Sequence, residues 1–229
     1  MSIAENIKLV RSRIELAAKR AGRDPNSIKL VAATKDVPAG LIEEAVRAGV
    51  TDIGENRVQE AKQKFDVLKG LPVTWHMIGH LQTNKVKSAL DVFSVIQSVD
   101  SERLMDEISN RAQKDIGIFI EVNTSEEKSK FGVSTEGAVQ LARRISGLKN
   151  LKLTGLMTVG PLTCDGSNTR KSFRSLSGLF DQIKRLNLPS VELKYLSMGM
   201  SQDFEAAIEE GSNLVRIGRA IFGIPHQRQ

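Results

Sequence analysis

The sequence predicts an α/β protein, a single (β/α)8 barrel of the TIM type with an extra helix at the N-terminus. Short apolar runs, partly β-branched, recur along the whole chain, and amphipathic segments with helical periodicity separate them. No segment rich in Gly, Pro and Ser divides the chain. A length of 229 residues is enough for one such domain with a full hydrophobic core. We therefore predict one domain over residues 1–229.

The first predicted element is a helix over residues 3–21. Its apolar residues recur at intervals of three and four, and Gly22 follows where the helix should end. Ser2 and Glu5 have the spacing of a capping box, so this N-terminus resembles a helix start rather than a secretion signal.

About eight candidate strands follow, each short and apolar. They cover residues 28–33, 52–53, 73–78, 92–96, 116–122, 151–157, 191–196 and 214–217. The helices predicted between them cover residues 38–48, 58–68, 101–114, 135–145, 172–186 and 201–210. Buried strands that alternate with helices indicate a parallel sheet covered by helices.

Two arrangements of such a sheet compete, a closed barrel and an open Rossmann-like sheet. A Rossmann dinucleotide site needs a G-x-G-x-x-G run directly after a strand, and the sequence has none. The segment nearest to a linker, residues 160–169, follows the sixth predicted strand and is interpreted as a loop between strand and helix. Both points favour the barrel.

Composition argues against partners such as nucleic acid and membranes. The net charge is +6 and the pI is near 9.5, but the basic residues are scattered and only 4% of residues are aromatic. No apolar run approaches the length of a membrane span. The single cysteine, Cys164, excludes an intrachain disulfide and fits a reducing compartment. We expect a cytoplasmic protein.

Functional residues of a barrel lie just beyond the carboxyl ends of its strands. Lys35 directly follows the first predicted strand and should therefore reach the barrel mouth. A lysine there is usually only solvated, but a partly desolvated one has a lowered pKa and can form an imine with an aldehyde.

The loops after the seventh and eighth strands are the usual phosphate site of this fold. Residues 196–201 offer two hydroxyl groups and a glycine before a predicted helix, and Gly218 after the eighth strand permits close approach of the backbone. Each glycine alone would indicate only a tight turn. Both tracts beside a lysine at the mouth favour a phosphate-bearing ligand.

A metal site is not expected. His76 and His80 are four residues apart, but they flank a predicted strand end and lack the glutamate of an H-E-x-x-H motif.

The chain resembles the pyridoxal phosphate homeostasis protein family over essentially its whole length. The motifs that carry this resemblance are Thr34-Lys35, Gly54-Glu55-Asn56-Arg57, His76-Met77-Ile78-Gly79-His80, Lys130-Phe131-Gly132, Gly155-Leu156-Met157-Thr158, Ser197-Met198-Gly199-Met200-Ser201 and Val215-Arg216-Ile217-Gly218-Arg219. The resemblance implies a barrel related to the N-terminal domain of alanine racemase, with pyridoxal 5′-phosphate as the cofactor.

The resemblance also implies the residues of the cofactor site. It carries the Schiff base to Lys35, a phosphate contact to Ser201 and to the backbone of Gly218 and Arg219, a position beside the ring to Asn56, and one near the pyridine nitrogen to Arg216. Ser197 and Met198 are included because they belong to the same tract as Ser201. Arg219 replaces the small hydroxyl residue that is more usual in the family, and Asn213 is also less usual.

The family resemblance leaves two main functions open, a carrier of the cofactor and a racemase. An arginine near the ring nitrogen does not keep it protonated, which weakens the ring as an electron sink. We expect no second domain after residue 229, and the only tyrosine, Tyr195, lies in a predicted strand. We therefore predict a carrier without catalytic residues.

In this interpretation the protein acts in vitamin B6 homeostasis and delivers the cofactor to apo-enzymes. We expect a monomer, with a dimer as the alternative. The remaining candidates are an amino-acid racemase and a barrel that binds another phosphorylated ligand.

Overall fold

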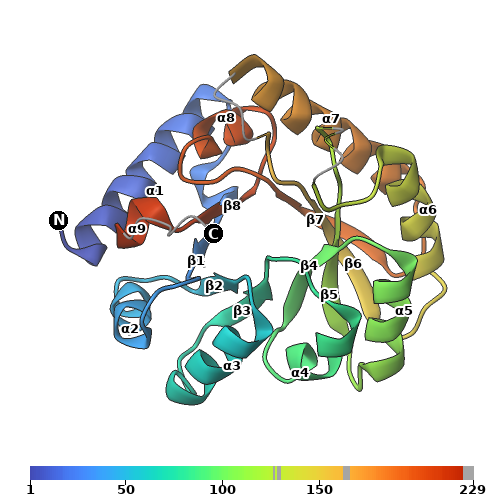
Figure 1. Ribbon diagram of the computed structural model, residues 1–229. Helices are drawn as coiled ribbons and strands as arrows, with labels where there is room; N and C mark the ends of the chain where they lie inside the picture. Colours follow the sequence, from blue (N-terminus) through green and yellow to red (C-terminus); the bar gives the residue numbers. More distant parts are fainter. Residues whose placement is uncertain (126, 128–129, 162–165, 224–229) are drawn as a thin grey trace.

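The computed structural model describes residues 1–125, 127, 130–161 and 166–223. Its centre is a closed barrel in which eight parallel strands follow one another in sequence order, and β1 pairs with both β2 and β8. The helices surround the barrel (Figure 1). The strands are β1 (Lys29–Ala33), β2 (Asp52–Glu55), β3 (Thr74–Met77), β4 (Val95–Val99), β5 (Ile116–Glu121), β6 (Leu151–Met157), β7 (Val191–Ser197) and β8 (Leu214–Ile217). The predicted (β/α)8 barrel is confirmed.

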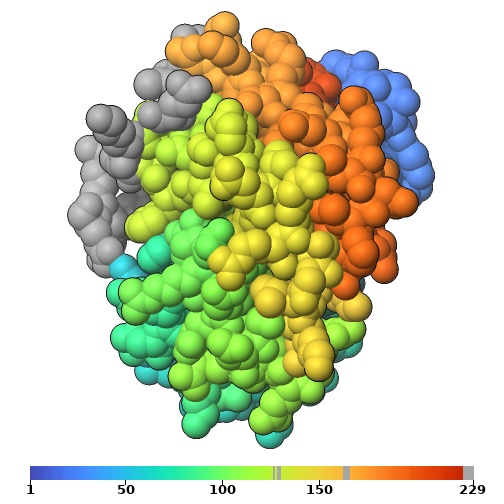
Figure 2. Space-filling view, turned by 90° about the vertical axis from the view of Figure 1, so that its right-hand side faces the viewer, coloured from blue at the N-terminus to red at the C-terminus, as the bar shows by residue number. Residues whose placement is uncertain are grey.

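The helices begin with α1, the extra N-terminal helix of the prediction. They are α1 (Ile3–Arg20), α2 (Ala39–Arg47), α3 (Val58–Val67), α4 (Val86–Leu90), α5 (Glu102–Arg111), α6 (Thr135–Ile145), α7 (Gly166–Arg185), α8 (Phe204–Glu209) and α9 (Arg219–Phe222), with short 3-10 turns at Pro25–Ser27 and Thr83–Lys85. The surface in Figure 2 runs from green to orange over the segments that include α5, α6 and α7, and these cover one side of the barrel.

Apolar side chains pack in two separate clusters, one inside the barrel and one around it. Inside the barrel, Val31, Phe119, Met157 and Leu214 form an apolar cluster. A much larger cluster lies between the outer face of the strands and the helices. Because side chains alternate along a strand, each strand contributes to both regions.

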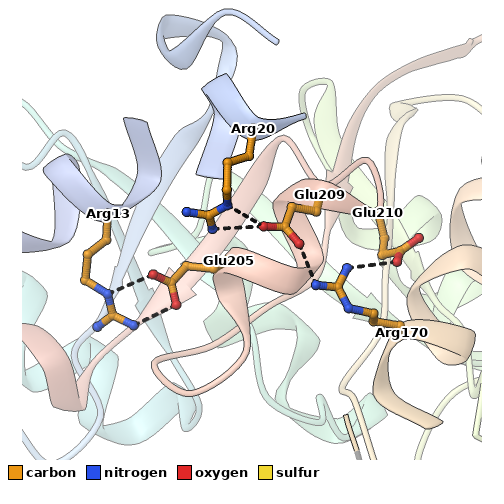
Figure 3. A network of polar contacts seen from close by, with 6 residues as sticks. All are labelled: Arg13, Arg20, Arg170, Glu205, Glu209 and Glu210. Atoms are coloured by element: carbon orange, nitrogen blue, oxygen red, sulfur yellow. Dashed lines mark hydrogen bonds and ion pairs between the residues drawn. The ribbon is translucent and has the colours of Figure 1, made fainter. Parts of the chain in front are cut away.

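α1 packs against α8 and α9, the elements next to β8 (Figure 1). The capping box predicted at Ser2 and Glu5 is present. Two ion pairs join α1 to α8: Arg13 with Glu205 at 2.9 Å and Arg20 with Glu209 at 2.8 Å. Figure 3 shows that Arg170 of α7 also reaches Glu209. Together these contacts tie the first helix to the last part of the barrel.

The fourth strand differs from its prediction at residues 92–96. The amide groups of Val92 and Phe93 donate hydrogen bonds to the carbonyl oxygen of Ala89, so these two residues belong to the turn after α4 instead of beginning a strand. Their side chains are still buried, which explains why the apolar pattern looked like a strand. β4 therefore starts three residues later, at Val95.

Two helical segments differ from the prediction. The predicted helices include none between the third and fourth strands, where a 3-10 turn and the five-residue α4 lie. α7 begins at Gly166 rather than at residue 172, so residues 166–169 of the predicted loop are helical. Its first turns are polar and carry little apolar periodicity. Cys164, also placed in that loop, lies outside the described residues.

Candidate functional site

Lys35 lies just beyond β1, at the end of the barrel where the strands have their carboxyl ends. Val31 of β1 packs inside the barrel, and the alternation of side chains puts Ala33 and Lys35 in the same row. The Lys35 side chain is half-buried. The lysine singled out in the sequence is therefore at the mouth.

A buried ion pair lies behind the peptide that precedes Lys35. The ammonium group of Lys64 donates to the carbonyl oxygen of Thr34 at 2.7 Å and to Glu55 Oε1 at 2.8 Å. The Thr34 hydroxyl donates to the same Glu55 oxygen at 2.6 Å. All three side chains are buried, so this cluster fixes the end of β1 from the side facing α3.

The peptide that follows Lys35 is held by the same cluster. The amide of Asp36 donates to Glu60 Oε1 at 2.7 Å, and Lys64 bonds that oxygen at 2.5 Å. Asp36 has φ of +60°, a left-handed conformation that is uncommon for residues other than glycine. Lys35 thus lies between two backbone groups that both bond to one buried network.

Gly218 brings the end of β8 against the end of β1. The register pairs Ala32 with Ile217, and a Cβ on Gly218 would lie 2.9 Å from the carbonyl oxygen of Ala33. A side chain at this position would force the two chains apart. Gly218 therefore keeps the loop after β8 close to Lys35.

The loop after β7 contacts the segment after β8 through Ser201. Its Oγ accepts a hydrogen bond from the amide of Ala220, at 3.3 Å, in the first turn of α9. Gly199 makes the turn possible, because it has φ of +96° and its Cβ would lie 2.6 Å from that of Ala207. Ser201, Gly218 and Arg219 thus lie on two loops that contact each other, whereas the Arg219 side chain is exposed.

Arg216 extends into the barrel interior from β8 and is almost completely buried. It donates to Ser197 Oγ at 2.5 Å and to the carbonyl oxygen of Thr158 at 2.8 Å. Burial lowers the pKa of its guanidinium to about 10, and the charges of Glu121 and Asp203 oppose that shift. The group remains a cation at neutral pH.

Glu121 was not predicted from the sequence. It ends β5, two residues beyond the interior residue Phe119, and is buried. Its Oε2 has no hydrogen-bond partner among the described residues. Burial, with the charge of Asp100, raises the pKa of this carboxyl to about 7, against the lowering effect of Arg216. A position at the end of an apolar strand is the signal that could have indicated it.

Asn56 and Met198 differ in what they can contribute. Asn56 follows β2 and is half-buried, and Gly79 lies so close that a Cβ there would be 2.6 Å from the Asn56 carbonyl oxygen. Met198 is completely buried, and its side chain belongs to the core between barrel and helices. Only the backbone of Met198 can therefore border the mouth.

Neither histidine belongs to a metal cluster. His76 bonds Asp52 and Gln97 inside the barrel, while His80 bonds Asp100 at 3.0 Å and stacks on Phe131. Within the described ranges, no three or more His, Cys, Asp or Glu residues lie where they could hold a metal ion. None of the helices in these same ranges is both long and apolar enough to span a membrane.

The mouth fits the cofactor that the resemblance implies. Because Gly218 has no side chain, the backbone after β8 lies directly against the β1 end that leads into Lys35. A serine hydroxyl and the first amides of a helix are suitable donors to a phosphate. The unpartnered oxygen of Glu121 shows that the interior keeps a buried polar atom that packing alone does not require.

Comparison with known proteins gave consistent matches. The family model of the alanine racemase N-terminal domain matches residues 3–226. The pyridoxal phosphate homeostasis protein of Aquifex aeolicus is 44% identical over 97% of this chain and 98% of its own length. The protein of the same name from Pseudomonas aeruginosa is 41% identical, over 97% of this chain and 95% of its own.

Solved structures match as well. PipY of Synechococcus elongatus with PLP bound has a TM-score of 0.85 and 32% identity, covering 97% of this chain and 100% of that one. Alanine racemase of Corynebacterium glutamicum has a TM-score of 0.72 at 16% identity, with 98% of this chain and 61% of that chain covered. The second match concerns the fold alone.

Proposed function

The chain belongs to the pyridoxal phosphate homeostasis protein family, and on this basis we propose that it binds pyridoxal 5′-phosphate covalently through Lys35 and acts as a carrier in vitamin B6 homeostasis. PipY, which this chain matches over its whole length, has been solved with PLP bound. When bound, the cofactor supplies an aldehyde that reacts with a primary amine and a pyridine ring that withdraws electrons.

One observation carries this proposal: the loops after β7 and β8, where this fold usually binds phosphate, contact the end of β1. Gly218 lies against the Ala33 carbonyl group, two residues before Lys35, and Ser201 bonds the helix turn that follows Gly218. A ligand with a phosphate at one end and an aldehyde at the other would meet both a donor set and an amine here.

Each remaining residue of the site has a role that follows from its position. Ser201 and the amides of Gly218 and Arg219 would donate to the phosphate, and Asn56 would lie beside the ring. The buried cation Arg216 would face the pyridine nitrogen and disfavour its protonation. Ser197 would act on the ligand only through Arg216, to which it is hydrogen-bonded.

We infer that the protein does not turn over amino acids. Racemisation needs a base that can reach the substrate, and Tyr195 is not placed to serve. This residue stacks on Phe119 in the barrel interior and lies beside Lys29, on the side away from the mouth. The permanent charge of Arg216 also weakens the ring as an electron sink.

The proposal extends to the setting in which the carrier works. It would release the cofactor to apo-enzymes in the cytoplasm and act as a monomer. Lys35 is half-buried at the mouth of the barrel. A carrier must release its ligand, and a half-buried lysine suits that role better than a fully enclosed lysine would.

Borohydride trapping tests the proposed attachment. Protein loaded with pyridoxal 5′-phosphate is reduced, digested and analysed by mass spectrometry, and the modified peptide should contain Lys35. Lys35→Ala should lose the adduct, whereas the control Lys85→Ala should keep it. An adduct that maps to Lys85 or Lys130 in the wild-type protein would refute the assignment.

A further inference from the structure

A continuous chain of hydrogen bonds crosses the barrel interior from the mouth to the opposite end. Arg216 Nη1 donates to Ser197 Oγ at 2.5 Å, and Ser197 Oγ donates to Gln97 Oε1 at 2.6 Å. Gln97 Nε2 is 3.0 Å from His76 Nδ1, and His76 Nε2 is 2.9 Å from Asp52 Oδ1. All five side chains are buried. The chain connects residues of β8, β7, β4, β3 and β2.

The chemistry of its two ends fixes the direction of this chain. Arg216 can only donate, so Ser197 accepts a hydrogen bond from it, and the Ser197 hydroxyl donates one to the side-chain carbonyl oxygen of Gln97. The Gln97 amide nitrogen then donates to Nδ1 of His76, which must be unprotonated. The proton of His76 is consequently on Nε2, where it meets the carboxylate of Asp52.

Electrostatics at the far end agrees with this direction. Burial lowers the pKa of His76, so the ring is neutral at pH 7, although Asp52 acts against that shift and Lys29 adds to it. Burial alone would raise the pKa of Asp52, but hydrogen bonds from His76, Thr51 and Lys29 lower it to about 2. A neutral histidine between a donating amide and a carboxylate satisfies every link.

Few other groups hold the Arg216 guanidinium. Its second described hydrogen bond goes to the carbonyl oxygen of Thr158, and the two contacts together orient the plane of the group. Ser197 could rotate to another partner if Gln97 did not accept its proton. The orientation of the cation at the mouth therefore depends on residues that lie deeper in the barrel.

We propose that Gln97 and His76 are positioning residues that hold Arg216, through Ser197, in the orientation it presents to the pyridine ring of the cofactor. This inference rests on the proposed function, because that ring is what Arg216 is expected to face. The two residues touch no ligand themselves. Their effect is to keep the guanidinium group of Arg216 in a fixed position.

The first test needs no cofactor. Nitrogen-15 NMR of the apo wild type should show His76 neutral at pH 7 with its proton on Nε2, the signal being assigned with a His76→Gln variant. Gln97→Glu keeps an acceptor for Ser197 but cannot donate to Nδ1, so His76 should become protonated on both nitrogens. A cationic His76, or a proton on Nδ1, in the wild type would overturn the proposal.

The second test follows the ring nitrogen of labelled pyridoxal 5′-phosphate bound to Lys35. Gln97→Leu removes both links of the amide, so Arg216 should be less well positioned and the ring pKa should rise by about one pH unit. Leu141→Met, a swap of similar volume on α6 in the core between the barrel and the helices, should leave the ring pKa unchanged.

The outcomes separate this inference from the proposed function. If Gln97→Leu forms the Lys35 adduct and its ring nitrogen titrates as in the wild type, Gln97 does not position Arg216. If the wild type itself forms no Lys35 adduct, the proposed function fails, and the apo measurement on His76 still decides whether the chain is polarised as described.

Discussion

The ammonium group of Lys64 on α3 lies 2.7 Å from the carbonyl oxygen of Thr34 and donates a hydrogen bond to it. Thr34 directly precedes Lys35 in the chain, and Glu60, another partner of Lys64, bonds the amide of Asp36 directly after it. The backbone on both sides of the lysine at the mouth is therefore held by side chains of α3.

Lys64→Met should destabilise the protein strongly. The change leaves the buried carboxyl of Glu55 without its cation, and breaking a buried ion pair costs about 3 to 5 kcal/mol. Urea denaturation monitored by circular dichroism measures the loss. Lys62→Met, on the exposed face of the same helix, is the control and should change the stability by less than about 0.5 kcal/mol. Equal stability of the two variants would contradict the role of Lys64.

Glu121 should make the stability of the apo protein depend on pH. Its pKa is about 7 in the folded state against an ordinary 4.5, so between these values the folded state binds more protons than the unfolded state. The free energy of unfolding should therefore fall as pH rises through this window, by about 3 kcal/mol at most.

Glu121→Gln should remove that fall, so the variant gains on the wild type between pH 5 and pH 8. Glu43→Gln, on α2, is the control and should follow the wild type. Parallel pH profiles for wild type and Glu121→Gln would show that Glu121 titrates normally.

Ser201→Ala should weaken the binding of pyridoxal 5′-phosphate about tenfold or more, because one charge-assisted hydrogen bond is worth about 1.5 to 3 kcal/mol. Pyridoxal, which lacks the phosphate, should bind more weakly than the phosphate ester and should lose little affinity in the variant. Titration followed by cofactor absorbance measures both. Ser146→Ala, at the end of α6, is the matched control. Equal affinity of the wild type for the two ligands would remove the phosphate site.

Arg216 should keep the pyridine nitrogen of the bound cofactor unprotonated near neutral pH. A fixed positive charge beside the nitrogen disfavours a second one, and Arg216→Gln should therefore raise the pKa of the ring nitrogen. Nitrogen-15 NMR of labelled cofactor reports the protonation directly. A ring nitrogen that is protonated at pH 7 in the wild type would show that Arg216 is not its partner.

Purified protein loaded with the cofactor should racemise L-alanine no faster than free pyridoxal 5′-phosphate does. Tyr195 lies beside Lys29 at the end of the barrel away from the mouth, and Arg216 is expected at the ring nitrogen, so we expect no strong base and electron sink to act together. Chiral chromatography of the amino acid after incubation measures the rate. Rapid racemisation that disappears in Lys35→Ala would favour the racemase alternative.

The repeat of strands and helices could be predicted from the sequence because the barrel buries its strands on both faces. The largely apolar segments 151–157 and 214–217, predicted as strands, coincide with β6 and β8. The same rule failed at Val92 and Phe93, which are buried in the turn between α4 and β4 rather than in a strand. An apolar residue in the sequence indicates burial, but it does not indicate which backbone conformation the buried residue adopts.

Some residues of the candidate site could likewise be predicted from the sequence, and others could not. Lys35, Ser201 and Gly218 could be singled out as candidates because they follow strands and the barrel fold brings strand ends together, and Arg216 because the family resemblance implies a role for it. Lys64 and Gln97 could not. Lys64 sits in a helix among exposed lysines, and Gln97 interrupts an apolar run, and only the tertiary structure shows what each one bonds.

The ion pairs between α1 and α8 in Figure 3 join residues 192 and 189 positions apart. On a ribosome, α1 is made long before α8 and β8, on the order of 10 to 40 s earlier at ordinary rates of synthesis. During that time α1 can pack against α2, but its apolar face, with Ile7, Val10 and Ile14, lacks the contacts that α8 and α9 supply at the closing edge of the barrel. The nascent chain is therefore open to chaperone binding or misassociation until the last strand closes the ring.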